Sequence, residues 1–283
     1  MNRPTKNAGI KKEVLQMRRF LCAVTFLCAT CAAFSAEKPE DDGSYHMLVS
    51  TGVGRFSGNY GEEENTTLDV LSVNARWYLQ RAELAVSVPY LRVDGAANVQ
   101  WIDGQPVAIG ADDGSGVRRK ESGLGDVVVR GEYYLVTGSS TSPWVIGVLR
   151  VKLPTGSESK GLGSGATDFE PGLSLIQRYG SINWMADVGY VFVGENSGVH
   201  AKNELRLGGG ASIPFGYEDR HSAYLYYENR TNRFDGPDRR SISIGASTAA
   251  GQGKRLRLSA SAFFGLSDSS EDIGGYVTVG YRY

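Results

Sequence analysis

Charged residues recur at every second position in several otherwise apolar stretches of the chain. This spacing puts them on one face of a β-strand, because successive side chains of a strand point to opposite sides. A row of mixed charge could form buried ion pairs or line a hydrated path for small polar or aromatic solutes, and both interpretations remain open. Cross-strand pairs such as Arg130 with Glu170, or Arg150 with Glu132, are geometrically allowed. The candidate lumen-lining residues are Arg76, Asp126, Arg130, Glu132, Arg150, Lys152, Asp168, Glu170, Asp187, Glu204, Arg206, Glu228 and Arg230.

The residues that nucleophilic catalysis and metal binding require are sparse. The histidines are His46, His200 and His221. His46 and His221 fall on the predicted periplasmic side, where a hydrolase site is not expected, and His200 lies near Ser197 without the nucleophile-elbow pattern. Three scattered histidines supply no ligand cluster for a metal ion. We therefore predict no catalytic residues, no metal site and no cofactor.

Strands must position the charged rows, and the apolar residues show the matching repeat of two. In the last eleven residues, Ile273, Val277, Val279 and Tyr281 alternate with wetter or smaller residues. Twelve such stretches are separated by turn-rich residues. The predicted strands are 45–57, 68–80, 83–93, 126–136, 145–154, 168–178, 182–193, 204–216, 222–232, 239–249, 255–266 and 273–283.

The connections between these strands alternate in length. Those after even-numbered strands are short, and those after odd-numbered strands are longer and more polar, as in residues 94–125. Outward aromatic residues collect at both ends of the strands, as they do at membrane interfaces. The pattern predicts an all-β fold, a closed antiparallel transmembrane β-barrel of about 12 strands with both termini periplasmic. A soluble, secreted all-β domain is the alternative.

The N-terminus carries the features of an export signal. Arg18 and Arg19 precede an apolar run too short to span a bilayer comfortably, which small residues follow. We predict a signal peptide over residues 1–36 (with a start at Met17 as an alternative), a periplasmic lead-in over 37–42 and a barrel over 43–283. All three cysteines fall within the signal peptide, so the mature chain has no disulfides. Without residues 1–36 the chain loses six of its 30 basic and one of its 31 acidic residues, so its net charge falls from −1 to −6, which argues against a nucleic-acid partner.

The connection over residues 94–125 contains more apolar residues than a solvated loop needs. Trp101 and Ile102 lie near its middle, and Arg118 and Arg119 lie near its end. We predict that these four residues gate the lumen, with the loop folded into the barrel mouth and its basic tail paired with acidic lumen residues. An extracellular hairpin is the alternative.

Several glycine-rich motifs resemble an outer-membrane family named for the MetA pathway of phenol degradation. They are GLGD at residues 123–126, KLPTG at 152–156, GLGSG at 161–165 followed by Asp168, and GYVFVG at 189–194. The match covers about residues 123–194; Glu170 and Pro171 depart from the pattern. The resemblance implies an outer-membrane barrel that helps hydrophobic or aromatic compounds to enter the cell.

These observations predict a narrow channel in the bacterial outer membrane for passive uptake of small, hydrophobic or aromatic solutes. A barrel of about twelve strands is narrower than a general porin. The expected partners are outer-membrane lipids and lipopolysaccharide, the barrel assembly machinery through the C-terminal strand, and a small-molecule solute. The alternative is a structural or surface-interaction barrel without transport; an outer-membrane enzyme is the weaker third interpretation.

Overall fold

The computed structural model describes residues 46–96, 99–102, 105–108, 118–139, 141–194, 201–234 and 236–283. For residues 101–102 and 105–108 it describes the backbone only. The predicted signal peptide over 1–36, the alternative start at Met17, the lead-in over 37–42, Ser197 and His200 all lie outside the described residues. No helix among the described residues is long and apolar enough to cross a membrane.

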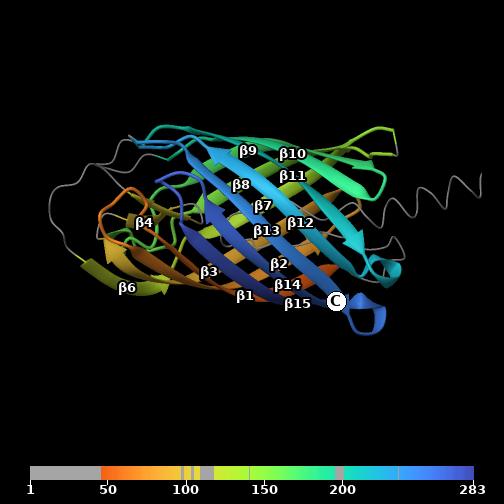
Figure 1. Ribbon diagram of the computed structural model, residues 1–283, viewed down its shortest axis with the longest axis horizontal. Helices are drawn as coiled ribbons and strands as arrows, with labels where there is room; N and C mark the ends of the chain where they lie inside the picture. The colour runs from red at the N-terminus through yellow and green to blue at the C-terminus, as the bar shows by residue number, and fades with distance from the viewer. Residues whose placement is uncertain are drawn as a thin grey trace, which may run out of the picture.

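Strands make up nearly all of the regular structure (Figure 1). They are β1 Met47–Gly58, β2 Thr66–Tyr78, β3 Ala82–Ala96, β4 Val99–Ile102, β5 Gln105–Ala108, β6 Arg118–Leu124, β7 Val127–Val136, β8 Trp144–Leu153, β9 Asp168–Tyr179, β10 Ile182–Val191, β11 Glu204–Phe215, β12 His221–Arg230, β13 Arg239–Ala250, β14 Leu256–Gly265 and β15 Ile273–Arg282. The 3-10 turns are η1 Glu158–Lys160, η2 Tyr217–Asp219 and η3 Gln252–Lys254.

Twelve strands close into one antiparallel barrel. The ring runs from β1 through β2, β3 and β7 to β15 in sequence order, and β15 pairs with β1 over its whole length, from Leu48↔Arg282 to Ser57↔Ile273. Closure leaves no exposed sheet edge around the ring. An open edge would place unpaired backbone N–H and C=O groups in the bilayer, where they have no partners. The prediction of a closed antiparallel barrel of about 12 strands is confirmed.

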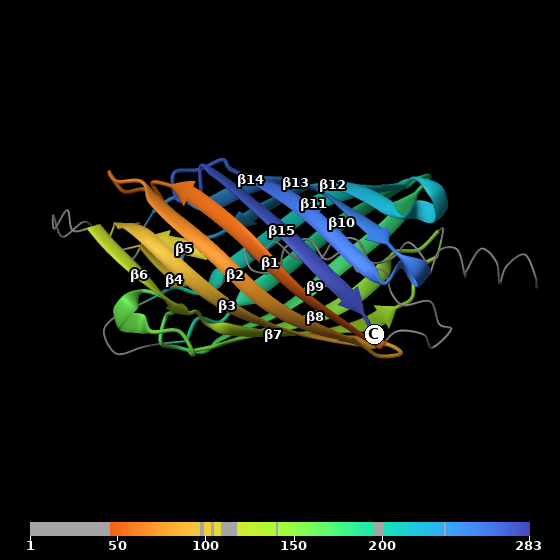
Figure 2. The ribbon, with the colours of Figure 1, turned by 90° about the horizontal axis from the view of Figure 1, so that it is seen from below.

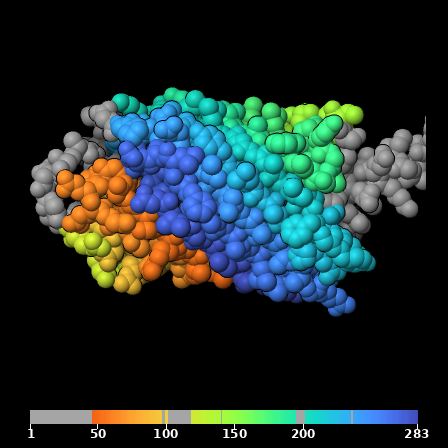
Figure 3. Space-filling view, viewed as in Figure 1, coloured from red at the N-terminus to blue at the C-terminus, as the bar shows by residue number. Residues whose placement is uncertain are grey.

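The two ends of the barrel differ (Figures 1 and 2). The C-terminus lies at one end, where the backbone N–H of His46 donates to the carbonyl of Tyr283 (2.8 Å). We call this the terminal end. β6 and the longer connections lie at the opposite end, the long-loop end. Strands reach both ends by winding diagonally around the barrel, as the bands of colour on its surface show (Figure 3).

Side chains alternate between lumen and outer surface along each strand. In β15, Tyr276 and Arg282 are 1% and 4% exposed, whereas Ile273 and Val277 are 55% and 53% exposed. The outer surface carries Leu, Val, Ile and aromatic residues, as a lipid-facing wall requires. Exposed aromatics end the strands on both sides, for example Trp184 and Tyr281 at the terminal end.

The segment 94–125 contains more regular structure than the loop expected there. β3 continues to Ala96 and pairs with β6 from Tyr90↔Leu124 to Ala96↔Arg118. This pair extends beyond the barrel at the long-loop end (Figure 1). β4 and β5 form a separate two-stranded hairpin. Because β7 also pairs with β3, β6 and β7 follow each other along one partner strand, separated only by Gly125 and Asp126.

Candidate functional site

A chain of ion pairs crosses the inner faces of strands β8 to β12. Arg150 Nη1 lies 3.0 Å from Glu170 Oε2, and Arg206 Nε lies 2.6 Å from Glu170 Oε1. Glu228 lies 3.7 Å from Arg206 Nη1 and 3.9 Å from Arg230 Nε. All five side chains are buried. Removing such charges from water is costly, so close pairing is what allows them to stay ionised in the lumen.

The chain of ion pairs continues to the long-loop end of the barrel. Glu204 Oε2 lies 3.6 Å from Arg230 Nη1, and Glu204 Oε1 lies 2.7 Å from Arg233 Nε. Arg233 Nη1 reaches Asp168 Oδ2 at 3.2 Å. Lys152 Nζ then lies 3.5 Å from Asp168 and 3.2 Å from Asp126.

These ten residues form a neutral arrangement that we call the lumen belt. Its members are Asp126, Arg150, Lys152, Asp168, Glu170, Glu204, Arg206, Glu228, Arg230 and Arg233. Five carry positive and five carry negative charge, so the belt has no net charge with which to hold a charged solute strongly. The sequence pattern missed Arg233, because it lies in the connection after β12 and follows no strand repeat.

A second charged cluster lies nearer the terminal end, between β2, β3 and β7. Arg76 Nη1 lies 2.9 Å from Glu83 Oε2, and Arg130 Nε lies 2.6 Å from Glu132 Oε1. Ala85 of β3 lies opposite Arg76 of β2 on one side and opposite Arg130 of β7 on the other, and Glu83 of β3 lies opposite Glu132 of β7. Each arginine is thus placed beside a carboxylate rather than beside the other arginine.

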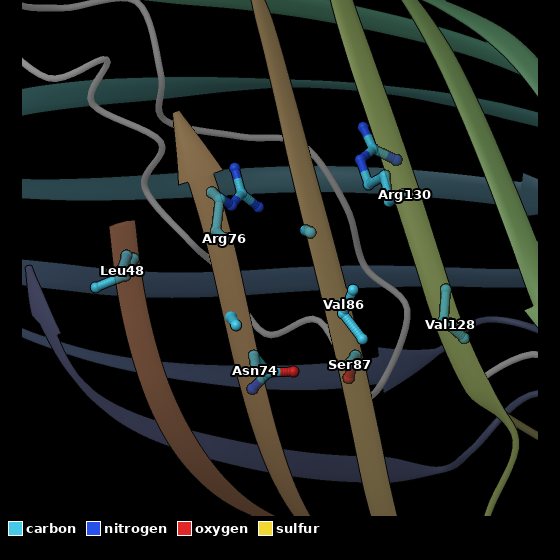
Figure 4. A pocket seen from close by; sticks show the side chains of 9 residues that line it. Leu48, Asn74, Arg76, Val86, Ser87, Val128 and Arg130 are labelled. Atoms are coloured by element: carbon cyan, nitrogen blue, oxygen red, sulfur yellow. The ribbon is translucent and has the colours of Figure 1, made fainter. Parts of the chain in front are cut away.

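A small pocket opens on the lumen side of these strands (Figure 4). Arg76 and Arg130 border it from β2 and β7, and Asn74 and Ser87 border it from below (Figure 4). Asn74 Nδ2 donates to Ser72 Oγ (2.9 Å). The rest of the lining is apolar: Leu48, Ala75, Ala85, Val86 and Val128.

All thirteen candidate lumen-lining residues are buried, at 1–7% exposure. Nine belong to the lumen belt; Arg76, Arg130 and Glu132 belong to the second cluster. The remaining one, Asp187, accepts hydrogen bonds from the Tyr226 hydroxyl (2.8 Å) and from Ser174. In the structure Arg130 pairs with Glu132 on its own strand, and Arg150 pairs with Glu170 across β8 and β9.

The lumen is not lined by charge alone. A buried apolar cluster, which we call the apolar wall, lies mainly on the inner faces of β1–β3, β12, β14 and β15. Its members are Phe56, Leu68, Val70, Leu91, Val93, Leu162, Tyr226, Phe263 and Tyr276. The sequence pattern did not predict this wall, because the repeat assigns apolar residues to the outside, whereas near the long-loop end of β2 the inward residues are Leu68 and Val70 and Asp69 between them points outward.

Aromatic residues of the apolar wall lie flat over glycines of the neighbouring strands. A Cβ on Gly52 would lie 2.5 Å from Oη of Tyr276, and a Cβ on Gly208 would fall on the hydroxyl of Tyr226. Such contacts are possible only where the underlying residue has no side chain. The rings therefore line the wall instead of crossing the lumen.

The four predicted gate residues are not gathered at one point. Arg118 is exposed and pairs with Asp94 (2.8 Å) and Glu64 (3.9 Å), which are rim acids and not the lumen acids expected. Arg119 is partly buried, and its Nη2 donates to the carbonyl of Val99 in β4 (2.9 Å). Trp101 and Ile102 lie on β4, and their side chains are outside the described part of the chain.

The residues that the structure describes bring no three His, Cys, Asp or Glu side chains together as a metal site would require. The arrangement is one of paired charges, hydroxyls and an apolar wall around a lumen. Chemically, it can bind or pass a small solute, because the lumen offers ring and alkyl groups as well as paired polar groups.

Comparison with known proteins identifies the sequence family and the fold. The sequence profile of the family described as "Putative MetA-pathway of phenol degradation" matches residues 53–283. No sequence among the curated proteins matches the chain.

Three solved outer-membrane structures share the barrel. The outer membrane channel from Pseudomonas putida F1 aligns with a TM-score of 0.63, covering 86% of this chain and 99% of its own at 11% identity. The KdgM porin aligns with a TM-score of 0.51, covering 83% and 99% at 9% identity. The translocator domain of the autotransporter NalP from Neisseria meningitidis aligns with a TM-score of 0.52, covering 86% and 90% at 11% identity. At these identities the likeness shows the fold alone, that of outer-membrane β-barrels.

Proposed function

The chain belongs to the MetA-pathway of phenol degradation family, and from that premise we propose that it is a narrow outer-membrane channel for passive uptake of small hydrophobic or aromatic solutes. The observation that carries the proposal is the composition of the lumen. The lumen contains both an apolar wall rich in aromatic rings and a belt of paired, mutually neutralised charges. A lumen that contains both gives an aromatic solute apolar contact without a net field that would select ions.

The outer surface supports a location in the bacterial outer membrane. Exposed Leu, Val and Ile side chains surround the barrel, and exposed aromatics lie toward both ends. In this location the termini are periplasmic, and β6 with the long connections is extracellular. The exposed Arg118 and Lys120 then lie at the level of the lipopolysaccharide phosphates, which we propose as their partners beside Asp94.

The function is tested by recording single channels from the refolded mature chain in planar bilayers. The structure predicts small conductance steps, since twelve strands leave a narrow lumen filled largely by side chains. Phenol and benzoate should interrupt the current in a concentration-dependent way as they occupy the lumen. Heat-modifiable migration in gels shows whether the chain is folded. A folded chain that gives no conductance steps would contradict the proposal.

Neutralising Arg130 should make the channel more cation-selective. Arg130→Gln removes one positive charge from a buried cluster and leaves the Glu132 carboxylate 2.6 Å from where the charge was. The reversal potential in a salt gradient should shift toward that of the cation. Arg92→Gln is the matched control, because Arg92 is exposed on the outward face of β3. An equal reversal potential for parent and Arg130→Gln would show that the lumen charges do not face the conducting path.

A structural or surface-interaction barrel without transport is the second candidate. The observation that favours it is the dense filling of the lumen: Arg206, Arg230 and Lys152 are among the largest fully buried side chains. In that case the planar-bilayer experiment gives no conductance. Deletions in the connections at the long-loop end should then abolish the structural or surface-interaction role.

The C-terminal residue should be needed for assembly into the membrane. Tyr283 closes the ring at the terminal end, since its N–H donates to Met47 and its carbonyl accepts from His46, both at 2.8 Å. It also ends the strand that we propose the barrel assembly machinery recognises. Deleting Tyr283 should lower the amount of folded barrel in membranes, as measured by heat-modifiable migration. Tyr283→Phe keeps both backbone bonds and the ring, and it should assemble normally; equal assembly of the deletion would contradict this role.

A further inference from the structure

The connection between β8 and β9 folds back into the barrel. Glu158, Ser159 and Lys160 at its tip are exposed, but Gly161, Leu162 and Gly163 are buried. Leu162 is 1% exposed and belongs to the apolar wall, where the other members that the structure describes lie on strands. We call residues 154–167 the inward loop.

Asp126 holds both arms of the inward loop. Its Oδ1 accepts from the backbone N–H of Gly156 (2.9 Å), and its Oδ2 accepts from the backbone N–H of Ser164 (3.2 Å). Lys152 Nζ lies 3.2 Å from the same Oδ2 and donates to the carbonyl of Ala166 (2.7 Å). The buried Asp126 carboxylate thus fixes both arms of the loop, and the buried Lys152 ammonium contacts this carboxylate and the second arm. Hydrogen bonds of this charge-assisted kind are the strong ones.

Glycines make this path of the inward loop possible. A Cβ on Gly163 would lie 2.3 Å from Asp126 Oδ1, and a Cβ on Gly156 would lie 2.3 Å from the carbonyl oxygen of Leu162. Gly161 adopts a φ of +62°, which favours glycine. Any other residue at Gly163 would push the loop away from the carboxylate.

Thr155 ties the inward loop to the barrel wall. Its Oγ1 accepts from the N–H of Val127 (2.8 Å) and donates to the carbonyl of Gly125 (2.9 Å). These two groups flank the place where β6 gives way to β7, and where Gly125 N–H bonds to the carbonyl of Pro89. The loop is therefore anchored at the wall and latched inside the lumen.

We propose that the inward loop is the constriction of the channel, that Leu162 sets its width, and that Asp126 is the positioning residue that keeps it closed. This inference rests on the proposed channel function and names the residues that limit it. It places the constriction in residues 154–167 and not in residues 94–125. Residues from three separate glycine-rich motifs then share one role, which is to hold the inward loop in the lumen. They are Asp126, Lys152, Gly156, Gly163 and Ser164.

Conductance tests the width that Leu162 sets. Leu162→Ala should raise the single-channel conductance about twofold or more, because current through a narrow pore depends on its narrowest section. Leu153→Ala is the matched control, since Leu153 is 36% exposed on the outer surface next to the loop. Asp126→Ala should also raise the conductance. A conductance of Leu162→Ala equal to that of the parent would overturn the assignment.

Thiol labelling tests the latch without relying on conduction. The mature chain after residue 36 has no cysteine, so Leu162→Cys supplies a single reporter. Its reaction with a water-soluble thiol reagent should be slow, and about tenfold faster or more when Asp126→Ala is added, because hydrogen bonds to a charged group are lost. Heat-modifiable migration must show that both variants are folded barrels.

The two readouts separate the possible failures. Equal labelling rates with and without Asp126 would overturn its role as the latch. Absence of conductance from the parent and from every variant would contradict the channel function itself. The labelling rate would still show whether Asp126 holds Leu162 inside the barrel. Faster labelling together with larger conductance supports both the latch and the constriction.

Discussion

Arg206→Met should lower the free energy of unfolding of the barrel by about 3–5 kcal/mol, because it leaves buried carboxylates with too few cations. Arg206 lies 2.6 Å from Glu170 and 3.7 Å from Glu228, and its side chain is 2% exposed. Methionine fills much of the same space, so the loss is one of charge more than of packing. Urea unfolding of the barrel in phospholipid vesicles, followed by tryptophan fluorescence, measures the effect.

An exposed arginine provides the matched control for this prediction. Arg118→Met makes the same chemical change at a side chain that is 55% exposed and pairs with Asp94 at the rim. Ion pairs of that kind contribute about 0–1 kcal/mol. Adding Glu228→Gln to Arg206→Met should restore part of the lost stability, since it removes one of the stranded charges. Equal stability of Arg206→Met and Arg118→Met would show that the lumen belt is hydrated and contributes little.

Tyr276→Ala should cost about 3–5 kcal/mol of unfolding free energy, the range for truncating a buried aromatic side chain. Tyr276 is 1% exposed, and its hydroxyl lies 2.5 Å from Ser72 Oγ. Its ring covers Gly52 on the adjacent strand, so truncation opens a cavity that β1 and β15 cannot close. Tyr281→Ala on the outward face of the same strand is the control and should cost less.

A paired substitution separates ring-on-glycine packing from a general packing loss. Gly52→Ala alone should destabilise the barrel by about 1–3 kcal/mol, because its new methyl group would meet Tyr276 atoms at 2.5–2.7 Å. In the Tyr276→Ala background the same substitution should cost almost nothing. If Gly52→Ala costs the same in both backgrounds, its effect comes from the glycine backbone and not from the ring.

The lumen belt and the apolar wall have different consequences for transport. The belt is neutral and closely paired, so it stabilises the interior of a narrow barrel without creating a strong field. The apolar wall offers ring and alkyl surface along one side of the lumen. Solute preference should therefore follow the wall, and ionic selectivity should follow whichever charge pair is broken.

The amino-acid pattern alone was enough to predict the barrel and the direction in which its side chains point. A strand repeat of two assigns each residue to one of two faces, so the thirteen charged candidates could be placed inside the barrel without knowledge of any contact. The predicted strand ends agree with the structure within three residues, as in β9, predicted over 168–178 and observed over Asp168–Tyr179. Exposed Trp184 and Tyr227 follow from the same parity.

Which residues meet in the lumen could not be predicted from that pattern and became clear from the three-dimensional fold. Periodicity gives the face of a residue but not its height relative to a neighbouring strand, so it could not show that Glu170 lies between Arg150 and Arg206. It also gives no direction for a connection: Leu162 lies inside because Asp126, 38 residues before Ser164, supplies the acceptor that turns the loop inward. That contact depends on the pairing of β7 with β8, which sets Val127 opposite Leu153 and so places Asp126 beside the start of the loop.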